Sequence, residues 1–204
     1  MQLIGMLDSP YVRRVAISLR LLGIPFEHQS ISVFRTFDRF RAINPVVKAP
    51  SLVCDDGEVL MDSTLILDYA EALAAPGKTL MPKDKRALQH ELRLLGLALA
   101  ACEKTVQIVY ERNLRPKEKQ HEPWLERVRG QLLAAYQALE AELKVRAPSL
   151  ARGKIGQAAV TTAVAWRFTQ HMLADVVAAS DFPALAAFSA AAEKLPDFVA
   201  TPLE

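Results

Sequence analysis

Residues 44–69, NPVVKAPSLVCDDGEVLMDSTLILDY, decide the fold of the first part of the chain. Two short apolar runs, Ser51–Cys54 and Val59–Met61, flank Asp55-Asp56-Gly57, which is a strong hairpin signal. Asp62-Ser63 then predicts the start of a helix, because both residue types favour helix N-termini. The apolar face of that helix comprises Leu65, Ile66, Tyr69 and Leu73. The stretch therefore predicts a strand, a tight turn, a second strand and an amphipathic helix.

The residues before this stretch alternate between apolar patterns typical of strands and patterns typical of helices. Gln2–Met6 predicts a buried strand, and a helix follows whose apolar spacing ends at Gly23. Ile24–Val33 predicts a second strand. Arg35–Ile43 predicts a short helix that stops before Asn44-Pro45, since a residue preceding proline disfavours the helical region. The first eighty residues are thus expected to form an α/β unit.

The pattern changes after Pro76-Gly77 and Met81-Pro82, which bracket a predicted linker. No later segment predicts a strand. The four expected helices are Lys83–Arg112, Pro123–Ala147, Ile155–Leu173 and Pro183–Leu195, and the third is apolar all round, as a central buried helix would be. We therefore predict an α/β domain over 1–76, a linker over 77–82 and an all-helical domain over 83–204.

Composition narrows the function classes. The 204 residues carry a net charge of +2, with 51% hydrophobic and 24% charged residues, which excludes a disordered or fibrous chain. Residues 1–80 hold 8 Lys/Arg and 9 Asp/Glu (net −1), whereas residues 81–204 hold 17 and 14 (net +3), so neither half predicts a nucleic-acid or membrane-surface module. We expect no signal peptide and no membrane span, because the longest apolar stretch, near Leu94–Cys102, is about half of the ~20 residues needed. Cys54 and Cys102 form no Cys-x-x-Cys pair, which suits a reducing cytosol and disfavours a disulfide scaffold or a zinc site.

Three short motifs in the first eighty residues fit a purely structural role, and each also fits a role in ligand binding or catalysis. Ser9-Pro10 suits a helix cap, but a hydroxyl at a helix N-terminus also stabilises an anion or a thiolate. Ala49-Pro50 precedes a strand, and the residues alone leave its peptide bond cis or trans. Asp62-Ser63 is a good cap, and it could equally bind the ammonium and carboxylate of an α-amino acid group.

Taken in order, these sites resemble the cytosolic glutathione S-transferase superfamily, in particular bacterial serine-type members. Residues 1–76 resemble its thioredoxin-like domain and 83–204 its helical domain. Ser9-Pro10-Tyr11 is similar to the family's Ser-Pro-aromatic segment. Asn44-Pro45-Val46-Val47-Lys48-Ala49-Pro50 is similar to its Asn-Pro-x-x-Lys-x-Pro, and Asp62–Tyr69 to its acidic-Ser-x-x-Ile-x-x-Tyr.

The resemblance implies roles for these residues. Ser9 would donate to the glutathione sulfur and be the catalytic residue. The remaining glutathione ligands would be Lys48 for the glycyl carboxylate, the Ala49 backbone before a cis Pro50 for the cysteinyl backbone, and Asp62 with Ser63 for the γ-glutamyl group. The aromatic candidates for the electrophile pocket are Tyr11, Phe34, Tyr110 and Trp166, although a helical aromatic such as Trp166 is more often a core residue.

The resemblance also implies a cytoplasmic homodimer that uses glutathione as co-substrate for attack on a small electrophile, with no metal. Glutathione-dependent isomerisation or dehalogenation, or a non-catalytic protein-binding role, are the alternatives. Two departures stand out. Neither position 9 nor position 10 is cysteine, which disfavours disulfide-reductase chemistry. The family's Ser/Thr-x-x-Asp cap of the buried helix is replaced by Gly156-Gln157-Ala158-Ala159.

Overall fold

A computed structural model describes residues 1–203 of the chain, and its contacts divide them into two compact units. The first unit comprises Met1–Leu80 together with the segment from Lys194 onward; the second comprises Met81–Glu193. Residues 194–203 were expected in the helical domain, whereas their contacts place them with the α/β unit. None of the helices within the described residues is long and apolar enough to cross a bilayer.

The first unit is built on a four-stranded mixed sheet with the order β2-β1-β3-β4. Its strands are β1 (Gln2–Ile4), β2 (Glu27–Gln29), β3 (Ser51–Val53) and β4 (Val59–Met61). β1 runs parallel to β2 and antiparallel to β3, and β3 and β4 form the predicted antiparallel hairpin. Its main helices are α1 (Pro10–Leu22), α2 (Phe37–Ile43) and α3 (Ser63–Leu73).

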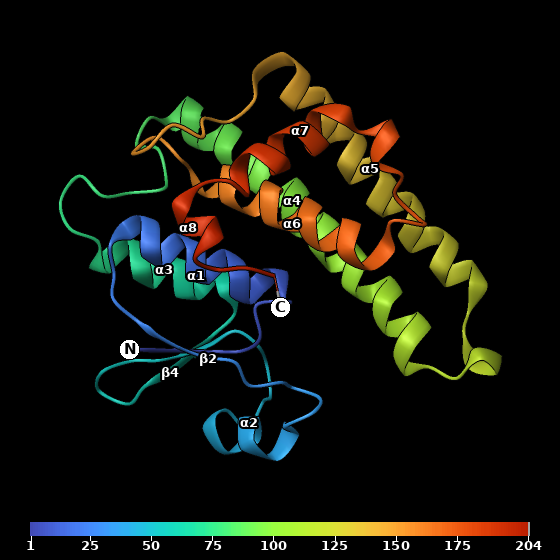
Figure 1. Cartoon of the computed structure of the whole chain (residues 1–204), viewed down its shortest axis with the longest axis horizontal. Coiled ribbons are helices and arrows are strands. Elements are labelled where there is room, and N and C mark those ends of the chain that lie inside the picture. The colour runs from blue at the N-terminus through green and yellow to red at the C-terminus, as the bar shows by residue number, and fades with distance from the viewer. Residues whose placement is uncertain (204) are drawn as a thin grey trace. The chain divides into compact units, whose positions relative to one another are not determined.

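Helices cover both faces of this sheet because side chains alternate along β1. Leu3 packs with Val15 of α1 and Ile66 of α3, whereas its neighbour Ile4 packs with Phe40 of α2 on the other face. Figure 1 shows the same arrangement, with α1 and α3 on one side of the strands and α2 on the other. The predicted thioredoxin-like architecture is confirmed.

The predicted second strand is shorter than expected. Only Glu27–Gln29 pairs with β1, and the chain from Ser32 to Thr36 forms a turn in which the Ser32 hydroxyl accepts the Arg35 N–H at 3.0 Å. The Thr36 hydroxyl donates to the Ser32 carbonyl at 2.9 Å. Hydrogen bonds of the hydroxyl side chains therefore take the place of backbone bonds to a neighbouring strand. Ser and Thr commonly stabilise turns in this way.

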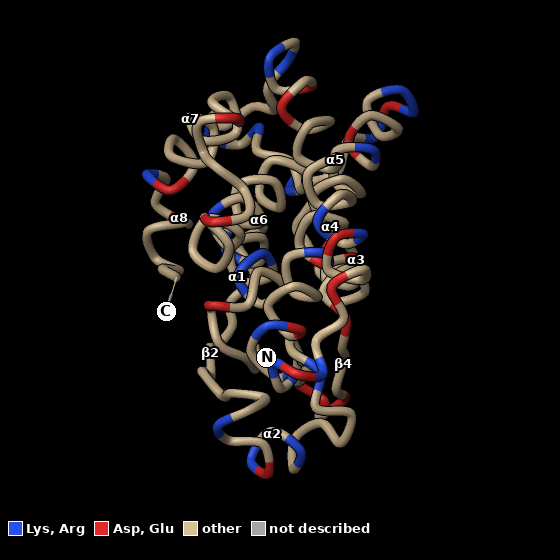
Figure 2. The backbone as a smooth tube through the Cα atoms, turned by 90° about the vertical axis from the view of Figure 1, so that its right-hand side faces the viewer, with Lys and Arg blue, Asp and Glu red and all other residues tan. Residues whose placement is uncertain are grey.

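The second unit is wholly helical over its described residues. It contains α4 (Lys85–Leu114), α5 (Glu122–Arg146), α6 (Gln157–Leu173) and α7 (Pro183–Ala192), with short 3₁₀ turns at Lys117–Lys119 and Ala179–Asp181. α6 is buried along almost its entire length and contacts α4 and α7, which confirms its prediction as the central helix. Lys and Arg are interspersed with Asp and Glu along α2, α4 and α5 (Figure 2).

The final predicted helix is interrupted at Leu195. α7 ends at Ala192 and a short α8 (Pro196–Val199) follows, because Leu195 precedes a proline and is extended at φ −73° and ψ 145°. The segment is held to α1 of the first unit by Arg13, whose Nε donates to the Thr201 carbonyl at 2.8 Å, and by an Arg20–Asp197 ion pair at 3.4 Å.

Helices α5, α6 and α7 lack local side-chain caps and are capped instead by glutamates from other helices. Glu91 of α4 accepts the Ala158 N–H of α6 at 2.7 Å, and Glu111 of α4 accepts the His121 N–H at the start of α5 at 3.0 Å. Glu140 of α5 accepts two N–H groups at the start of α7. Carboxylates at helix N-termini also complement the helix dipole. The cap that Gly156 cannot provide is therefore supplied by Glu91, 67 positions from Ala158.

Replacing Gly156 with alanine is expected to destabilise the second unit by about 1 kcal/mol, the usual effect of losing a cap. A Cβ at Gly156 would lie 2.5 Å from Glu91 Oε1, so the carboxylate must move away from Ala158. Gly130→Ala is the matched control, because a Cβ there meets nothing within 4 Å and removing a helical glycine stabilises by roughly 0.5–1 kcal/mol. Urea denaturation measures both; equal effects of the two variants would contradict the Glu91 cap.

Candidate active site

Ser9 stands at the N-terminus of α1 without acting as a side-chain cap. It is the N-cap residue, at φ −71° and ψ 123°, and its carbonyl accepts the Arg13 N–H at 3.0 Å, but its hydroxyl makes no capping bond. Pro10 follows at the first helical position. The half-buried Ser9 hydroxyl is thus placed at the positive end of the helix dipole, where it can donate to an anion.

The turn that leads into Ser9 requires a glycine. Gly5 adopts φ 137°, and a Cβ there would lie 2.6 Å from Val12 Cγ2, so any other residue would force β1 and α1 apart. The Ser9 N–H then donates to the Met6 carbonyl at 3.2 Å. This close approach fixes where α1 begins, and with it the position of the Ser9 hydroxyl.

Asn44 holds the loop that carries Lys48, Ala49 and Pro50. Its buried side chain donates to Ser51 Oγ at 2.8 Å, and its carbonyl oxygen Oδ1 accepts the Val46 N–H at 3.0 Å. The Ser51 hydroxyl in turn donates to the Lys48 carbonyl at 2.8 Å. The Ala49-Pro50 peptide bond is cis, the form that the family resemblance implied. Sequence reasoning assigned no role to Asn44 or Ser51, although Asn44 lies inside the quoted motif.

Asp62 connects this loop with the start of α3. Its Oδ1 accepts the Thr64 N–H at 3.0 Å, which is the predicted cap, and its Oδ2 accepts from the Lys48 ammonium at 3.1 Å. Burial alone would raise the pKa of Asp62, but the Thr64 N–H and Lys48 outweigh it and hold that pKa below its ordinary value. Asp62 also has a positive φ of 72°, which is unusual for a residue with a side chain. The carboxylate is therefore ionised at neutral pH and directed toward a cation.

Ser63 and Thr64 follow in the first turn of α3 and receive a partner that sequence reasoning missed. Arg14 of α1 donates from one guanidinium nitrogen to Ser63 Oγ at 2.9 Å and to Thr64 Oγ1 at 3.3 Å. Arg14 is 1% exposed and Ser63 is 4% exposed. No local pattern predicts this contact, because the two residues are 49 positions apart.

These contacts bring most of the predicted residues into one connected set. Lys48 and Asp62 are paired, and Ser63 is joined to α1 through Arg14. Arg14 lies five residues after Ser9 on the same helix, which corresponds to about 7.5 Å along its axis at 1.5 Å per residue. The first unit therefore offers a hydroxyl at one helix N-terminus, and a carboxylate, an ammonium and a second hydroxyl at another.

The four aromatic candidates for the electrophile pocket have different surroundings. In the first unit Phe34 is 56% exposed and Tyr11 is half-buried. In the second unit Tyr110 is 44% exposed and lines a cavity of about 570 Å³ together with Trp124, which the sequence analysis did not single out. Trp166 is 4% exposed and packs edge-on against Tyr136 with ring centroids 5.2 Å apart, so its surroundings favour the core role.

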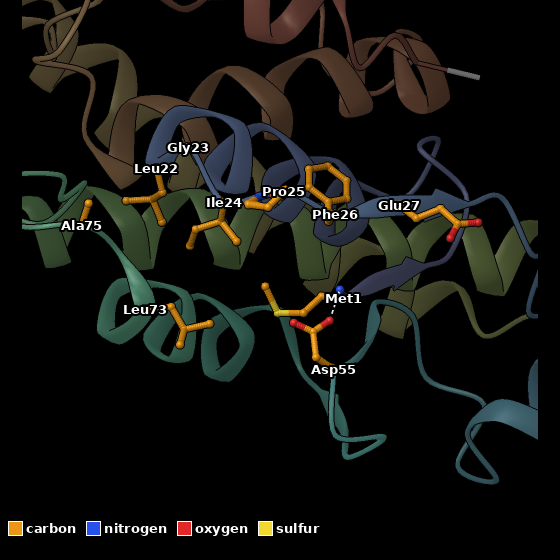
Figure 3. Close-up of a pocket in the computed structure, with 10 residues that line it drawn as sticks. All are labelled: Met1, Leu22, Gly23, Ile24, Pro25, Phe26, Glu27, Asp55, Leu73 and Ala75. Atoms are coloured by element: carbon orange, nitrogen blue, oxygen red, sulfur yellow. Dashed lines mark hydrogen bonds and ion pairs between the residues drawn. The ribbon is translucent and has the colours of Figure 1, made fainter.

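A separate hollow in the first unit lies away from the candidate ligands. It has a volume of about 690 Å³ and is lined by residues at the C-terminal ends of α1 and α3 and by the segment that leads into β2. Figure 3 shows Leu22, Ile24 and Leu73 on its walls, with the Met1 ammonium and Asp55 bonded at 2.5 Å. None of the predicted glutathione ligands lines it.

Neither cysteine is placed to act as a nucleophile. Cys54 and Cys102 are both buried, and neither forms a disulfide. Burial, followed by the nearby Asp56 carboxylate, raises the pKa of the Cys54 thiol, so it stays protonated at neutral pH. Within residues 1–203, no group of three or more His, Cys, Asp or Glu side chains is arranged to hold a metal ion.

A thioredoxin-like unit with this pair of helix N-termini, followed by an all-helical unit, defines the class of protein to which the chain belongs. Comparison with known proteins agrees. The family model of the glutathione S-transferase N-terminal domain matches residues 3–78. The GST-like protein YibF of Escherichia coli is 31% identical over 144 residues, which cover 70% of this chain and 70% of that protein.

Solved structures extend the similarity to the whole chain. A glutathione transferase family member from Pseudomonas fluorescens, solved with bound glutathione, is 30% identical, has a TM-score of 0.86 and is matched over 100% of this chain and 98% of its own. A second structure of this P. fluorescens family member, with bound S-(propanoic acid)-glutathione, gives a TM-score of 0.81, with 98% of each chain covered. The chain belongs to the glutathione S-transferase family.

Proposed function

We propose that the chain is a serine-type glutathione transferase whose first unit binds glutathione and activates its thiol. In this proposal Asp62 binds the γ-glutamyl ammonium, Ser63 binds the γ-glutamyl carboxylate and Lys48 binds the glycyl carboxylate. The Ala49 backbone, beside Pro50, pairs with the cysteinyl backbone. The P. fluorescens relative with bound glutathione, at 30% identity, supports glutathione as the ligand.

The charges of these residues match the ligand. The Asp62 carboxylate has its pKa held low by the Thr64 N–H and Lys48 despite partial burial, so it is ready to pair with an ammonium. The α3 N-terminus adds backbone N–H groups and a positive dipole end for a carboxylate. The Lys48–Asp62 ion pair would exchange for ligand contacts on binding, which neutralises both groups again.

Ser9 carries the proposed chemistry, and the observation that supports it is its uncommitted hydroxyl. A serine that only capped α1 would accept one of the helix's first N–H groups, and Ser9 does not. Its O–H would donate to the glutathione sulfur and lower the thiol pKa from the ordinary ~8.5 of a free thiol. The thiol proton would pass to solvent, the sulfur electron pair would form a bond to the electrophilic carbon, and the leaving group would depart with its own electron pair.

The second unit would supply the electrophile pocket. The cavity beside Tyr110 and Trp124 has two aromatic walls and a volume suited to a small apolar molecule. The S-substituted glutathione bound to the P. fluorescens relative supports attack by the sulfur on a small carbon electrophile. Isomerisation and dehalogenation need the same first unit and remain the alternative reactions.

Calorimetry with glutathione tests the proposal against a non-catalytic protein-binding role. We expect saturable binding of one glutathione per chain at micromolar to millimolar concentration. Absence of heat at millimolar glutathione would contradict the proposed function and favour the protein-binding role. A glutathione variant without its thiol should bind similarly, because the proposed ligands of the first unit mostly hold groups other than sulfur.

We also propose a homodimer located in the cytoplasm. The exposed face of α3 carries Leu65, Tyr69 and Leu73, which are 62%, 38% and 45% exposed, and such an apolar stripe favours a protein partner. Neither Cys54 nor Cys102 forms a disulfide, which fits a reducing compartment. Sedimentation that gives a 22.5 kDa species would contradict the dimer.

A further inference from the structure

Two consecutive arginines near the start of α1 are almost completely buried. Arg13 and Arg14 are each 1% exposed. Burying a guanidinium is costly unless its N–H groups are bonded, so each side chain must serve a definite contact. Because neighbouring positions on a helix point about 100° apart, the two side chains reach different parts of the first unit.

Arg13 serves the C-terminal segment. Its Nε donates to the Thr201 carbonyl at 2.8 Å, and its guanidinium lies 5.9 Å from the centre of the Phe198 ring. These contacts hold the chain around α8 against α1. Arg13 therefore has a structural explanation that is independent of any ligand.

Arg14 serves the start of α3, where the proposed γ-glutamyl site lies. Its guanidinium donates to Ser63 Oγ at 2.9 Å. A guanidinium has only donors, so the Ser63 oxygen must accept and its own hydroxyl proton must point elsewhere. A serine hydroxyl held in this way is oriented as a donor, and a nearby positive charge favours an anion as its acceptor.

We propose that Arg14 is a positioning residue for the γ-glutamyl α-carboxylate of glutathione. It acts through Ser63, by orienting the hydroxyl, and by placing a buried positive charge behind the α3 N-terminus. In this role Arg14 acts on the γ-glutamyl end of the ligand, so we expect it to affect glutathione affinity and not the activation of the thiol. This inference rests on the proposed function, because it specifies how the same site recognises one group of its ligand.

Arg14→Gln is expected to weaken glutathione binding by about tenfold or more, the size of a lost hydrogen bond that involves a charged group. Turnover at saturating glutathione should stay within about threefold of wild type, so the effect appears in KM and not in kcat. Arg13→Gln is the matched control, because Arg13 is equally buried on the same helix but contacts the C-terminal segment. This variant should lower the melting temperature without changing the Kd for glutathione.

Two glutathione analogues make the test specific to the carboxylate. One lacks the γ-glutamyl α-carboxylate and the other lacks the γ-glutamyl amino group. We expect Arg14→Gln and wild type to bind the first analogue equally, and to differ by the full factor for the second. An equal penalty for both analogues, or a Kd for glutathione unchanged from wild type, would overturn the role of Arg14.

Folding is checked by circular dichroism before any Kd is compared. If Arg14→Gln does not fold, Arg14→Lys replaces it, because lysine keeps the charge but lacks the fixed fork of donors. The same pattern with the analogues is then expected with a smaller factor, and wild-type affinity would overturn the inference. Failure of wild type to bind glutathione would instead refute the proposed function, so the two failures are distinguishable.

Discussion

Ser9→Ala is expected to lower turnover by about 10- to 100-fold, the range that corresponds to losing one hydrogen bond to a charged group. The substitution removes the donor to the glutathione thiolate, so the thiol pKa in the complex should rise toward its ordinary ~8.5 and the pH–rate profile should shift upward. Affinity for glutathione should stay within about twofold, because the other proposed ligands bind the γ-glutamyl and glycyl ends. Steady-state rates with an electrophile that the wild type accepts, together with calorimetry, measure both quantities.

Stability separates this role from a capping role. A capping serine costs about 1 kcal/mol when replaced by alanine. The Ser9 hydroxyl makes no capping bond, so the free energy of unfolding should change by less than about 0.5 kcal/mol. Ser9→Thr is the matched control and should retain most activity, since it keeps the hydroxyl. Unchanged turnover in Ser9→Ala, or a large loss of stability with it, would contradict the assignment.

The fold could be predicted because its elements have strong local signals. The Asp55-Asp56-Gly57 turn lies between strands β3 and β4, as predicted, and Gly23 ends α1 in the left-handed conformation. The spacing of apolar residues predicted the ends of the four long helices of the second unit to within a few residues. Errors fell where local signals are weak, as in the region after Gln29, where hydroxyl bonds of Ser32 and Thr36 form a turn in place of the strand.

The residues of the candidate site also differ in whether a local sequence signal predicts them. Lys48, Asp62 and Ser63 were predicted from their motifs, and the contact between Lys48 and Asp62 joins two of those motifs. Arg14 and Glu91 were missed, because each acts on a residue at least 49 positions away. A single sequence shows only how residues are spaced along the chain. The roles of Arg14 and Glu91 depend on the helix N-termini that the fold brings next to them, and spacing does not reveal these contacts.

Glu140→Ala is expected to destabilise the second unit by about 2–3 kcal/mol, because it removes the shared acceptor of two N–H groups at a buried helix start. Glu140 Oε1 accepts the Ala184 N–H at 3.0 Å and Oε2 accepts the Leu185 N–H at 2.9 Å, while Lys144 lies 3.2 Å from Oε1. The residue is 5% exposed, so water does not replace the lost acceptor. Glu126→Ala is the control on the same helix, since that side chain is 62% exposed and should change stability by under about 0.5 kcal/mol.

The stabilisation that Glu140 provides should change with pH in a predictable direction. Burial alone would raise the pKa of Glu140, but the Ala184 and Leu185 N–H groups, with Lys144, outweigh it and lower that pKa below its ordinary value. A lowered folded-state pKa stabilises the protein above the ordinary glutamate pKa of ~4.3, and the stabilisation is lost as the pH falls through the folded-state value. The difference in unfolding free energy between wild type and Glu140→Ala should therefore be constant from pH 7 to about pH 5 and shrink below it. A difference that grows on acidification would mean that the protonated carboxyl, and not the carboxylate, caps α7.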